Sequence, residues 1–472
     1  MASTTLDPPL DPGIEPETLL RQRVWGVRFD VLAAFLSLCL VAAANLVITW
    51  GHWYSFYKIF AWAPPLFAYW HPHVGPGTPL AVVLAAVVIL RGPDLAARLR
   101  WRALAPLGYL FGVAWTLAVP LVDGWNRGVP QRLESGDEYL ADLHRITDIP
   151  QFLRTFTEHI ISGQPGSWVV HVSGHPPGAT LVFVWLQRIG LAGGNFAALA
   201  CVLVGGLAVI AVPVTLRALD NDRAARAVLP FLVLLPGPAI AGVSADWLFA
   251  GVASTGVALL ATGAVGLRAA WSVRYLACCL AAGLLLGFGL FLSYGLALFA
   301  LVPLAVLVLA RGWRAIGPAV AGVAAVVAVF AAAGFWWLDG YHLVVHRYYQ
   351  DVGFTRPYNY WVWANLAALV LITGPAFAAG LRRAAAGAVE MVRTRVFGSD
   401  RVVLALTLAA ALVVAGADES GLSKAETERI WLPFAVWLIA AAGLLPARHR
   451  RWWLIAQVVV ALVVKTLLWT QW

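Results

Sequence analysis

Long apolar runs separated by short polar segments recur along almost the whole chain. Each is close to the roughly 20 residues that an α-helix needs to cross a hydrocarbon core about 30 Å thick. The break at Ser293-Tyr294-Gly295 is the least distinct division between two runs. The pattern predicts an all-α, polytopic membrane protein with about 13 transmembrane helices, near residues 29–50, 76–91, 103–122, 194–217, 225–241, 247–267, 275–291, 295–310, 315–337, 360–381, 402–416, 429–446 and 452–470.

The composition agrees with this interpretation. Of the 472 residues, 61% are hydrophobic and 12% charged, whereas soluble domains are about 45–50% apolar and about 25% charged. A net charge of +9 would suggest nucleic-acid binding in a soluble protein, but in a multi-pass membrane protein the location of the charges matters more, and we expect no nucleic-acid partner. The four cysteines all lie inside apolar runs, which supports neither disulfides nor a cysteine metal site.

The distribution of arginine predicts the orientation of the chain. Arginines cluster before the first run and again after the second, at 98–102, and this alternation continues along the chain. The positive-inside rule then places the N-terminus in the cytoplasm and, with an odd number of spans, the C-terminus outside. We expect residues 1–28, which are polar and proline-rich, to form a disordered cytoplasmic tail, and residues 29–472 to form one transmembrane domain. All histidines except His449 fall on the outer face, so we expect the chemistry to face outward.

The longest predicted outer loop spans residues 123–193. Long loops in compact proteins are commonly functional, and aromatic residues recur in this one at helical intervals. Residues 151–163 place Phe152, Phe156 and Ile160 on one helical face. This pattern is typical of a juxtamembrane helix that lies in the membrane interface.

Carboxylates in or near this loop are candidates for acid–base chemistry. Asp123 ends the third apolar run, where an ionisable group is costly unless it is paired or used. Asp137 and Glu138 follow a glycine in SGDEYL. They form either an acidic first helical turn, which the helix dipole favours, or a base for proton transfer. Asp246, in GVSADWLF, is either functional or hydrogen-bonded, and the sequence does not rank the two.

Histidines occur twice at i, i+4 spacing, as His171/His175 and as His342/His346. Such a pair can share a metal ion on a helix. No third ligand follows at a fixed spacing, and the Gly-Pro context of His175 disfavours a helix there. We therefore expect hydrogen bonding to substrate as the default role. A divalent metal ion stays open as a cofactor, and no other cofactor is predicted.

Basic side chains in two further outer loops are candidates for binding phosphate. His346 and Arg347 lie in a tyrosine-rich loop, and the alternative there is an aromatic belt with snorkelling arginines. Lys424 and Arg429 lie in ADESGLSKAETERIWLPF, where a guanidinium could bind phosphate oxygens in a bidentate manner. The alternative is that Arg429 pairs with a neighbouring carboxylate, Glu426 or Glu428.

Several segments together resemble a known family. GDEYLADL, followed about 30 residues later by HPPGATLVFVWLQRIGL, is similar to the outward-facing GT-C glycosyltransferases of the protein-mannosyltransferase and aminoarabinose-transferase type. LPGPAIAGVSADWLFAG, LLLGFGLFLSYGLAL and SKAETERIWLPFAVWL follow in the family's order, over about residues 120–445. Two features depart from the family's pattern. Tyr294 stands where the family commonly has lysine, and two extra apolar runs precede the acidic loop. Residue usage resembles that of a high-GC actinobacterium.

The resemblance implies transfer of a hexosyl or pentosyl group from a polyprenyl-phosphate donor to an envelope glycan, lipid or protein acceptor at the outer face of the cell membrane. The implied base is Asp123, Asp137 or Glu138. The alternative function is a membrane transporter or a flippase for lipid-linked sugars, which internal repeats and mid-membrane polar residues would favour; the sequence has no evident repeat. The residues implied to bind substrate or phosphate are His171, His175, His346, Arg347, Lys424 and Arg429.

Overall fold

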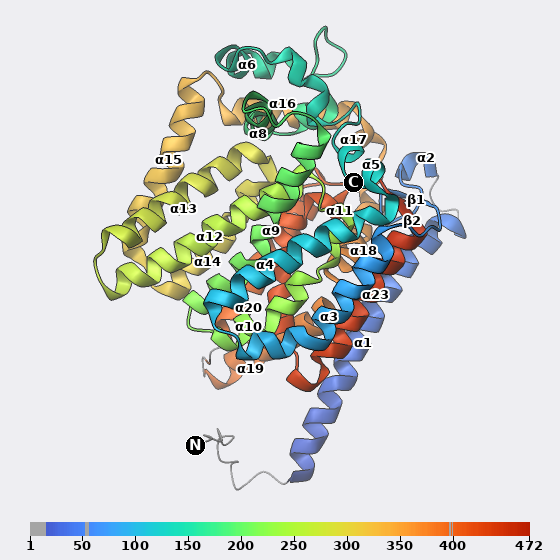
Figure 1. Cartoon of the computed structure of the whole chain (residues 1–472), viewed down its shortest axis with the longest axis vertical. Helices are drawn as coiled ribbons and strands as arrows, with labels where there is room; N and C mark the ends of the chain where they lie inside the picture. The colour runs from blue at the N-terminus through green and yellow to red at the C-terminus, as the bar shows by residue number, and fades with distance from the viewer. Residues whose placement is uncertain (1–15, 52–55, 396–397, 399) are drawn as a thin grey trace.

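The computed structural model describes residues 16–51, 56–395, 398 and 400–472, and it is built almost entirely of helices (Figure 1). The strands in this part of the chain are β1 (Ala68–Trp70) and β2 (Leu468–Thr470), which pair antiparallel. The predicted all-α, polytopic architecture is therefore confirmed. Helix α1 begins at Pro16, inside the predicted tail, and residues 1–15 of that tail lie outside the described residues.

The number of helices that could cross a membrane is smaller than the predicted 13. In the described ranges, nine have the required length and apolar character, or eleven if each of two bent pairs counts as one span. The nine are built from α1 (Pro16–Thr49), α3 (Gly77–Arg98), α4 (Trp101–Ala118), α9 (Gly194–Ala218), α10 (Asp222–Val233) with α11 (Pro236–Ala241), α12 (Ala245–Ala269), α13 (Val273–Leu292), α15 (Ile316–Ala332) and α20 (Arg401–Glu419).

Two physical features account for the difference. The run at 295–310 is divided between a 3₁₀ segment and α14 (Leu301–Ala310), which together form only a short apolar helix. Helices α18 (Tyr358–Thr373) and α19 (Pro375–Thr394) meet at 108°, where Gly374 has φ +80° and a proline follows. The segment 432–444, which starts with α22 (Leu432–Leu438), meets the one that ends with α23 (Arg450–Leu467) at 115°.

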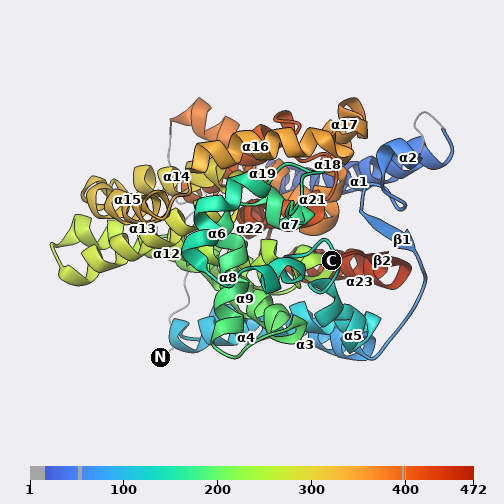
Figure 2. The same ribbon diagram turned by 90° about the horizontal axis from the view of Figure 1, so that it is seen from above.

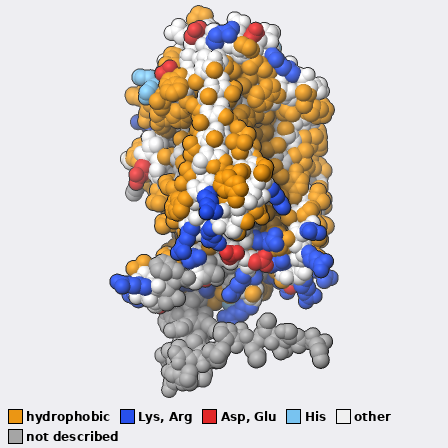
Figure 3. Space-filling model, turned by 90° about the vertical axis from the view of Figure 1, so that its left-hand side faces the viewer, with side chains coloured by type: hydrophobic (Ala, Val, Ile, Leu, Met, Phe, Trp, Pro, Cys, Tyr) orange, Lys and Arg blue, Asp and Glu red, His pale blue; other side chains and the backbone are white. Residues whose placement is uncertain are grey.

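Figure 1 places the C-terminus towards the end of the molecule that carries α5 (Trp125–Gly128), α8 (Pro177–Arg188) and α16 (Trp337–Gln350). Between the two ends, Figure 3 shows a broad hydrophobic surface, with lysine and arginine gathered towards the lower end. Exposed arginines at helix turns include Arg268, Arg274, Arg311 and Arg314. The arrangement suits a bilayer around the apolar belt, and the assignment of the lower end to the cytoplasm stays a prediction.

The loop predicted at 123–193 is an ordered layer of short helices. The 3₁₀ turns are η1 (Pro120–Asp123), η2 (Pro130–Arg132), η3 (Tyr139–Arg145) and η4 (Phe156–His159), and the α-helices are α5 (Trp125–Gly128), α6 (Ile149–Thr155), α7 (Val170–Gly174) and α8 (Pro177–Arg188). The apolar face of 151–163 is not directed at a membrane surface as expected. Phe156 and Ile160 are fully buried, and the ring of Phe156 lies 5.5 Å from that of Phe335.

Glycines allow helices α9 and α12 to pack closely at the centre of the bundle. A Cβ on Gly205 would overlap the Trp247 ring, and one on Gly251 would overlap the carbonyl of Val204. Small residues at such crossings let helix backbones approach in a membrane protein. Because α12 is held this way, the buried residue Asp246 in its first turn has a fixed place. Arg429 of α21 (Thr427–Ile430) binds Asp246 and also contacts His171 of α7 and Trp472 at the C-terminus. Figure 2 shows α7, α21 and the C-terminus grouped near the centre of the view from above.

Candidate functional site

Arg429, in the single turn of α21, lies at the centre of a buried group of charged side chains. Its Nη1 atom is 2.6 Å from Oδ2 of Asp246, and its Nη2 atom is 3.0 Å from Oε2 of Glu426 and 2.8 Å from Nε2 of His171. We call Glu138, His171, Asp246, Glu426 and Arg429 the Arg429 cluster. Burial disfavours the charge on Arg429, but the two carboxylates outweigh it and hold the pKa of Arg429 above its usual value.

His171 is held as a neutral imidazole by its two ring nitrogens. Nδ1 donates to the backbone carbonyl of Asp137 at 2.8 Å, and the backbone N–H of His171 donates to the same carbonyl. Nε2 must then accept from Arg429, which assigns the Nδ1–H tautomer. Burial, with the nearby charge of Arg429, lowers the pKa of His171 to about 3. His171 therefore stays neutral across the physiological pH range.

Glu138 contributes a buried carboxyl group to this cluster. It is 6% exposed, and its Oε1 atom lies 3.6 Å from Nδ1 of His171. Among the described residues no lysine or arginine lies within ion-pair distance of this carboxylate. Burial raises the pKa of Glu138 to about 8, although the charge of Arg429 acts in the opposite direction. A carboxyl group that titrates near neutral pH in a buried site is suited to accept or donate a proton during a reaction.

The neighbours of Glu138 in the predicted motifs have different environments. The side chain of Asp137 is exposed, so it contributes to the cluster only its backbone carbonyl. His175 follows α7, and its Nδ1 donates to the carbonyl of His171 at 2.9 Å. Its ring lies between the rings of Tyr139 and Phe249, at 5.6 and 5.7 Å, and burial lowers the pKa of His175. Helix α8 then starts directly at Pro177.

Glu426 joins a second arginine to the cluster. Its Oε1 atom is 3.1 Å from Nη2 of Arg356, and its other oxygen binds Arg429, so Arg429 pairs with Glu426 rather than Glu428. Ala425 and Glu426 both have left-handed backbones, with φ of +72° and +61°, which is uncommon for residues other than glycine and costs of order ~1–3 kcal/mol each. Burial would raise the pKa of Glu426, but the two arginines hold it at about 2.

Lys424 and Arg347 are the predicted phosphate-binding residues whose charges are least neutralised. Lys424 is 7% exposed, and its Nζ donates to the backbone carbonyl of Gly353. Arg347, on α16, is 9% exposed; its Nε and Nη1 have no hydrogen-bond partner in the described part of the chain, and Nη2 is 3.4 Å from Asp351. A buried cation without a close counter-ion is costly. A bound anion would therefore stabilise this region. His346, which directly precedes Arg347 on α16, is exposed.

Asp123 lies in a second buried group, which we call the Asp123 cluster. Its Oδ1 atom is 2.7 Å from Nε2 of His73, and its Oδ2 atom is 2.7 Å from Nζ of Lys465 and also contacts Arg132. The side chain is fully buried. Both carboxylate oxygens thus contact basic groups. Asp123 therefore has a structural role in this cluster and is not available as a base.

The C-terminal segment links the two clusters. The carbonyl of Thr470 accepts a hydrogen bond from Arg132, and Lys465 Nζ is 3.4 Å from its hydroxyl. Two residues later, the Trp472 ring lies 4.5 Å from the guanidinium of Arg429, and its Nε1 donates to Glu428 at 3.1 Å. The Asp123 cluster therefore helps to hold the aromatic floor beneath Arg429.

Comparison with known proteins concerns the fold alone, since no family model and no curated protein matches the sequence. Three similar solved structures are the oligosaccharyltransferase from Archaeoglobus fulgidus with Zn and sulfate (15% identity, TM-score 0.47), ArnT from Cupriavidus metallidurans bound to undecaprenyl phosphate (19%, 0.43), and AglB from A. fulgidus with an inhibitory peptide and a dolichol-phosphate (12%, 0.45). All are GT-C glycosyltransferases.

The chain spans only part of these structures. The similar regions cover 77%, 71% and 78% of this chain, but 53%, 59% and 56% of the respective structures. They belong to the class that the sequence motifs resemble. Because the identities and TM-scores are low, the activity of this protein has to be argued from its own residues.

The donor set around the histidines does not fit a metal ion. Both ring nitrogens of His171 are engaged, one with a carbonyl and one with Arg429. Across the described ranges, no three His, Cys, Asp or Glu side chains form a group that could hold a metal ion. His342 and His346 are both exposed on α16. We therefore derive no chemical step that uses a metal.

Several residues in or beside the two clusters had no assigned role in the sequence. Asp246 was noted, but its two possible roles could not be ranked, and Arg356 and His73 had no distinguishing pattern. Lys465 carried a usable signal, because a lysine inside an apolar run is costly without an acidic partner. Trp472 carried none, since tryptophans are numerous near membrane interfaces.

Proposed function

We propose that this protein is an integral-membrane glycosyltransferase. It would transfer a hexosyl or pentosyl group from a polyprenyl-phosphate donor to a hydroxyl group of an envelope glycan, lipid or protein acceptor on the outer face of the cell membrane. The observation that carries the proposal is the placement of Glu138. Its carboxyl group is buried, has a pKa raised to about 8, and lies beside a neutral histidine. At the same end of the molecule, Lys424 is buried and has no carboxylate within ion-pair distance in the described part of the chain, and Arg347 has Asp351 at 3.4 Å but two nitrogens without a partner.

Glu138 is the base in this proposal. Its ionised carboxylate removes the proton of the acceptor hydroxyl as that oxygen bonds to the anomeric carbon of the sugar, and the bond from this carbon to the phosphate oxygen breaks. A base is most effective when its pKa lies near the working pH, and burial gives Glu138 a pKa of about 8. His171 and Arg429 are positioning residues: His171 fixes the segment that carries Glu138, and Arg429 fixes His171.

The leaving polyprenyl phosphate carries the electron pair of the broken bond and gains negative charge. Cations aimed at developing charge lower the barrier to such a step. Arg429 is engaged by Asp246 and Glu426, so we assign the phosphate to Lys424 and Arg347. Lys424 contacts the aromatic side chains of Tyr348 and Tyr349, which directly follow Arg347, and one phosphate group could therefore contact both cations. His175 would line the sugar side of the site.

A transporter or flippase for lipid-linked sugars is the alternative. The two sharply bent helix pairs are a feature that such proteins share. The Arg429 cluster, however, is built largely on the short helices at one end of the molecule rather than at the bends. Transbilayer movement of a labelled lipid-linked sugar, without formation of a glycosylated product, would support the alternative.

The test is transfer of labelled sugar in lipid nanodiscs. Purified protein is supplied with a panel of polyprenyl-phosphate sugars and an envelope acceptor fraction, and products are separated by mass. Glu138→Gln should reduce the rate by about 10²–10⁴-fold, the usual contribution of a general base. Glu158→Gln is the matched control, because this exposed carboxylate lies in the same layer of short helices. Full activity in Glu138→Gln, or an equal loss in both variants, would refute the assignment.

A further inference from the structure

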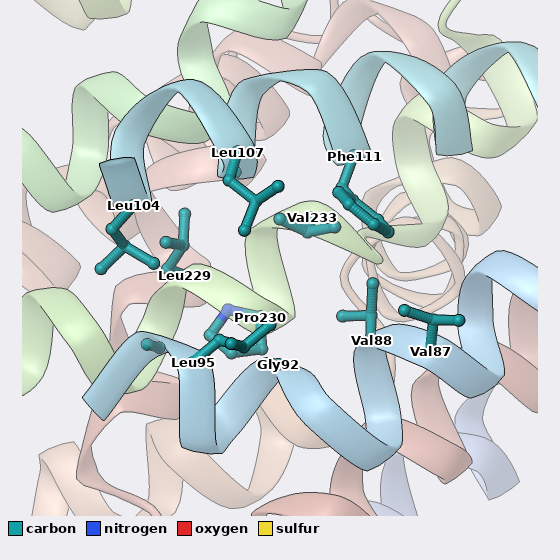
Figure 4. Close-up of a pocket in the computed structure, with 12 residues that line it drawn as sticks. Val87, Val88, Gly92, Leu95, Leu104, Leu107, Phe111, Leu229, Pro230 and Val233 are labelled. Carbon is teal, nitrogen blue, oxygen red and sulfur yellow. The ribbon is translucent and has the colours of Figure 1, made fainter. Parts of the chain in front are cut away.

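An apolar groove lies between α3, α4 and α10, away from the Arg429 cluster. Every residue that lines it is apolar or glycine. Val88 and Leu229 are buried in its floor, whereas Val87 and Leu95 at its rim are 40% and 38% exposed. Figure 4 shows side chains of α4 directed across the groove towards α3, with those of α10 behind them. The groove is therefore open on the side that faces the surrounding bilayer.

A glycine keeps this groove open. Gly92 lies on α3, and a Cβ there would be 3.1 Å from the Val88 side chain and 3.5 Å from Pro230. A larger side chain at this position would extend into the space between α3 and α10. A substitution at Gly92 should therefore change the shape of the groove without removing any polar side chain.

Four arginines without a carboxylate partner in the described part of the chain lie on α3 or at the start of α4. Arg91, Arg98, Arg100 and Arg102 are all exposed, and none forms an ion pair with a carboxylate in the part of the chain that the structure describes. Arg91 lies four residues before the groove residue Leu95, and Arg98 lies three residues after it. Residues at these spacings share one face of a helix. Arg91 and Arg98 therefore lie on the face of α3 that lines the groove.

The carboxylates near these arginines bind other basic residues instead. Arg226, which lies at the same corner, is bound by Asp222 and by the carbonyls of Ala96 and Leu99. Arg451 is bound by Asp94. The nearby carboxylates thus already have partners, so Arg91 and Arg98 can contact an anion from outside the chain.

We propose that this groove and its arginines form a binding site for an anionic phospholipid. One acyl chain occupies the groove, and the lipid phosphate contacts the guanidinium groups of Arg91 and Arg98. A zwitterionic lipid such as phosphatidylcholine also carries a phosphate, but its choline cation cancels that charge and leaves the positive charge of the arginines uncompensated. Free phosphate would not fill the apolar space. Basic pockets at the membrane edge between transmembrane helices bind anionic headgroups in this way. The site goes beyond the proposed transferase and does not depend on it.

Native mass spectrometry of the full chain tests this proposal. The protein is exchanged into phosphatidylglycerol or phosphatidylcholine and then washed in detergent, and the retained lipid is counted. Wild type should retain one phosphatidylglycerol molecule and lose phosphatidylcholine. Arg91→Gln/Arg98→Gln should weaken phosphatidylglycerol binding by about 25-fold, since each basic residue near an anionic lipid contributes about fivefold. Gly92→Leu should abolish retention.

Matched controls separate the site from general effects of charge and bulk. Arg274→Gln/Arg311→Gln removes two exposed arginines from other helix turns. Gly317→Leu adds the same bulk to α15 at a position where a Cβ meets nothing within 4 Å. Both controls should retain lipid like wild type. Equal retention of phosphatidylcholine, equal losses in the two arginine pairs, or normal binding in Gly92→Leu would each overturn the proposal. If Gly92→Leu does not fold, the arginine pairs, all exposed, still decide it.

Discussion

Raising the pH from 6 to 9 should increase the transfer rate of this protein while lowering its thermal stability. Both effects have one cause in the structure, the protonation of Glu138. Only the ionised carboxylate can accept the proton of the acceptor hydroxyl, so the rate should follow the ionised fraction. The folded protein, in contrast, holds the neutral form more favourably than the unfolded chain does, because burial raises the pKa of this carboxyl group.

The magnitude follows from the pKa values. Burial moves the pKa of Glu138 from 4.5 to about 8, which at about 1.36 kcal/mol per pH unit corresponds to roughly 5 kcal/mol in favour of the protonated form. Near pH 7 about one-tenth of the molecules are ionised, so kcat/KM should rise about tenfold from pH 6 to 7 and level off above about pH 8. The stabilising contribution is complete below the unfolded pKa of 4.5 and is lost as the pH rises to about 8.

Titration of two residues near Glu138 should not overlap with that of Glu138 itself. His171 has a pKa lowered to about 3 by burial, and Glu426, held by Arg356 and Arg429 against the effect of burial, has one of about 2. Both therefore keep one charge state between pH 5 and 9.

The assay measures initial rates of labelled-sugar transfer in nanodiscs from pH 5.5 to 9, with thermal unfolding followed in the same buffers. Glu138→Gln should lose the rate and also the decline of stability between pH 5 and 8, because the amide does not titrate. Asp137→Asn should keep both pH dependences, since the side chain of Asp137 is exposed. A rate that is independent of pH in wild type, or a rising limb that persists in Glu138→Gln, would refute the reasoning.

Three further predictions concern the buried charges. Arg429→Gln should reduce the free energy of unfolding by about 3–5 kcal/mol, because it removes the ion-pair partner of the buried Asp246 and leaves Glu426 with Arg356 alone. Denaturant unfolding in detergent measures this, and a change within error would contradict it. Asp123→Asn should destabilise the protein because its buried ion pairs are lost. The transfer rate of this variant should still rise with pH up to about pH 8, as in wild type. Lys424→Ala and Arg347→Ala should each lower kcat/KM for the polyprenyl-phosphate donor by about 10–100-fold, the value of a charge-assisted hydrogen bond, and an unchanged donor dependence would exclude that residue from the phosphate site.

The helical architecture was predictable because burial in a bilayer imposes a simple length rule. Most apolar runs correspond to helices. Polar ends are not included in the runs, so α1 begins at Pro16 rather than near residue 29 and α3 ends at Arg98 rather than near residue 91. The run at 360–381 shows the limit of that rule. It crosses Gly374, whose left-handed backbone and following proline turn the chain by 108°, and hydropathy records length but not direction. A glycine-proline pair inside an apolar run is the signal that could have divided it.

The two adjacent candidates Asp137 and Glu138 could not be separated from the sequence, and the backbone explains why. Glu138 has an extended conformation, with φ −88° and ψ 166°, and successive side chains of an extended backbone point to opposite sides. One carboxylate is thus exposed while the other is buried beside His171. The acidic motif located the segment, but the choice between its residues depends on the local backbone.

The contrast between Asp123 and Glu138 depends on contacts that are distant in sequence. Asp123 is bound by Lys465, 342 residues away, and also by Arg132 and His73, so its charge is fully compensated. In the sequence, Asp123 could have been either a partner in an ion pair or a catalytic group, because an ionisable residue at the membrane edge is costly otherwise. The structure shows it in ion pairs. Glu138 has no lysine or arginine within ion-pair distance in the described part of the chain, and burial, together with the nearby carboxylates of Asp246 and Glu426, raises its pKa. Different surroundings, rather than different residue types, therefore separate a structural carboxylate from one that can exchange a proton near neutral pH.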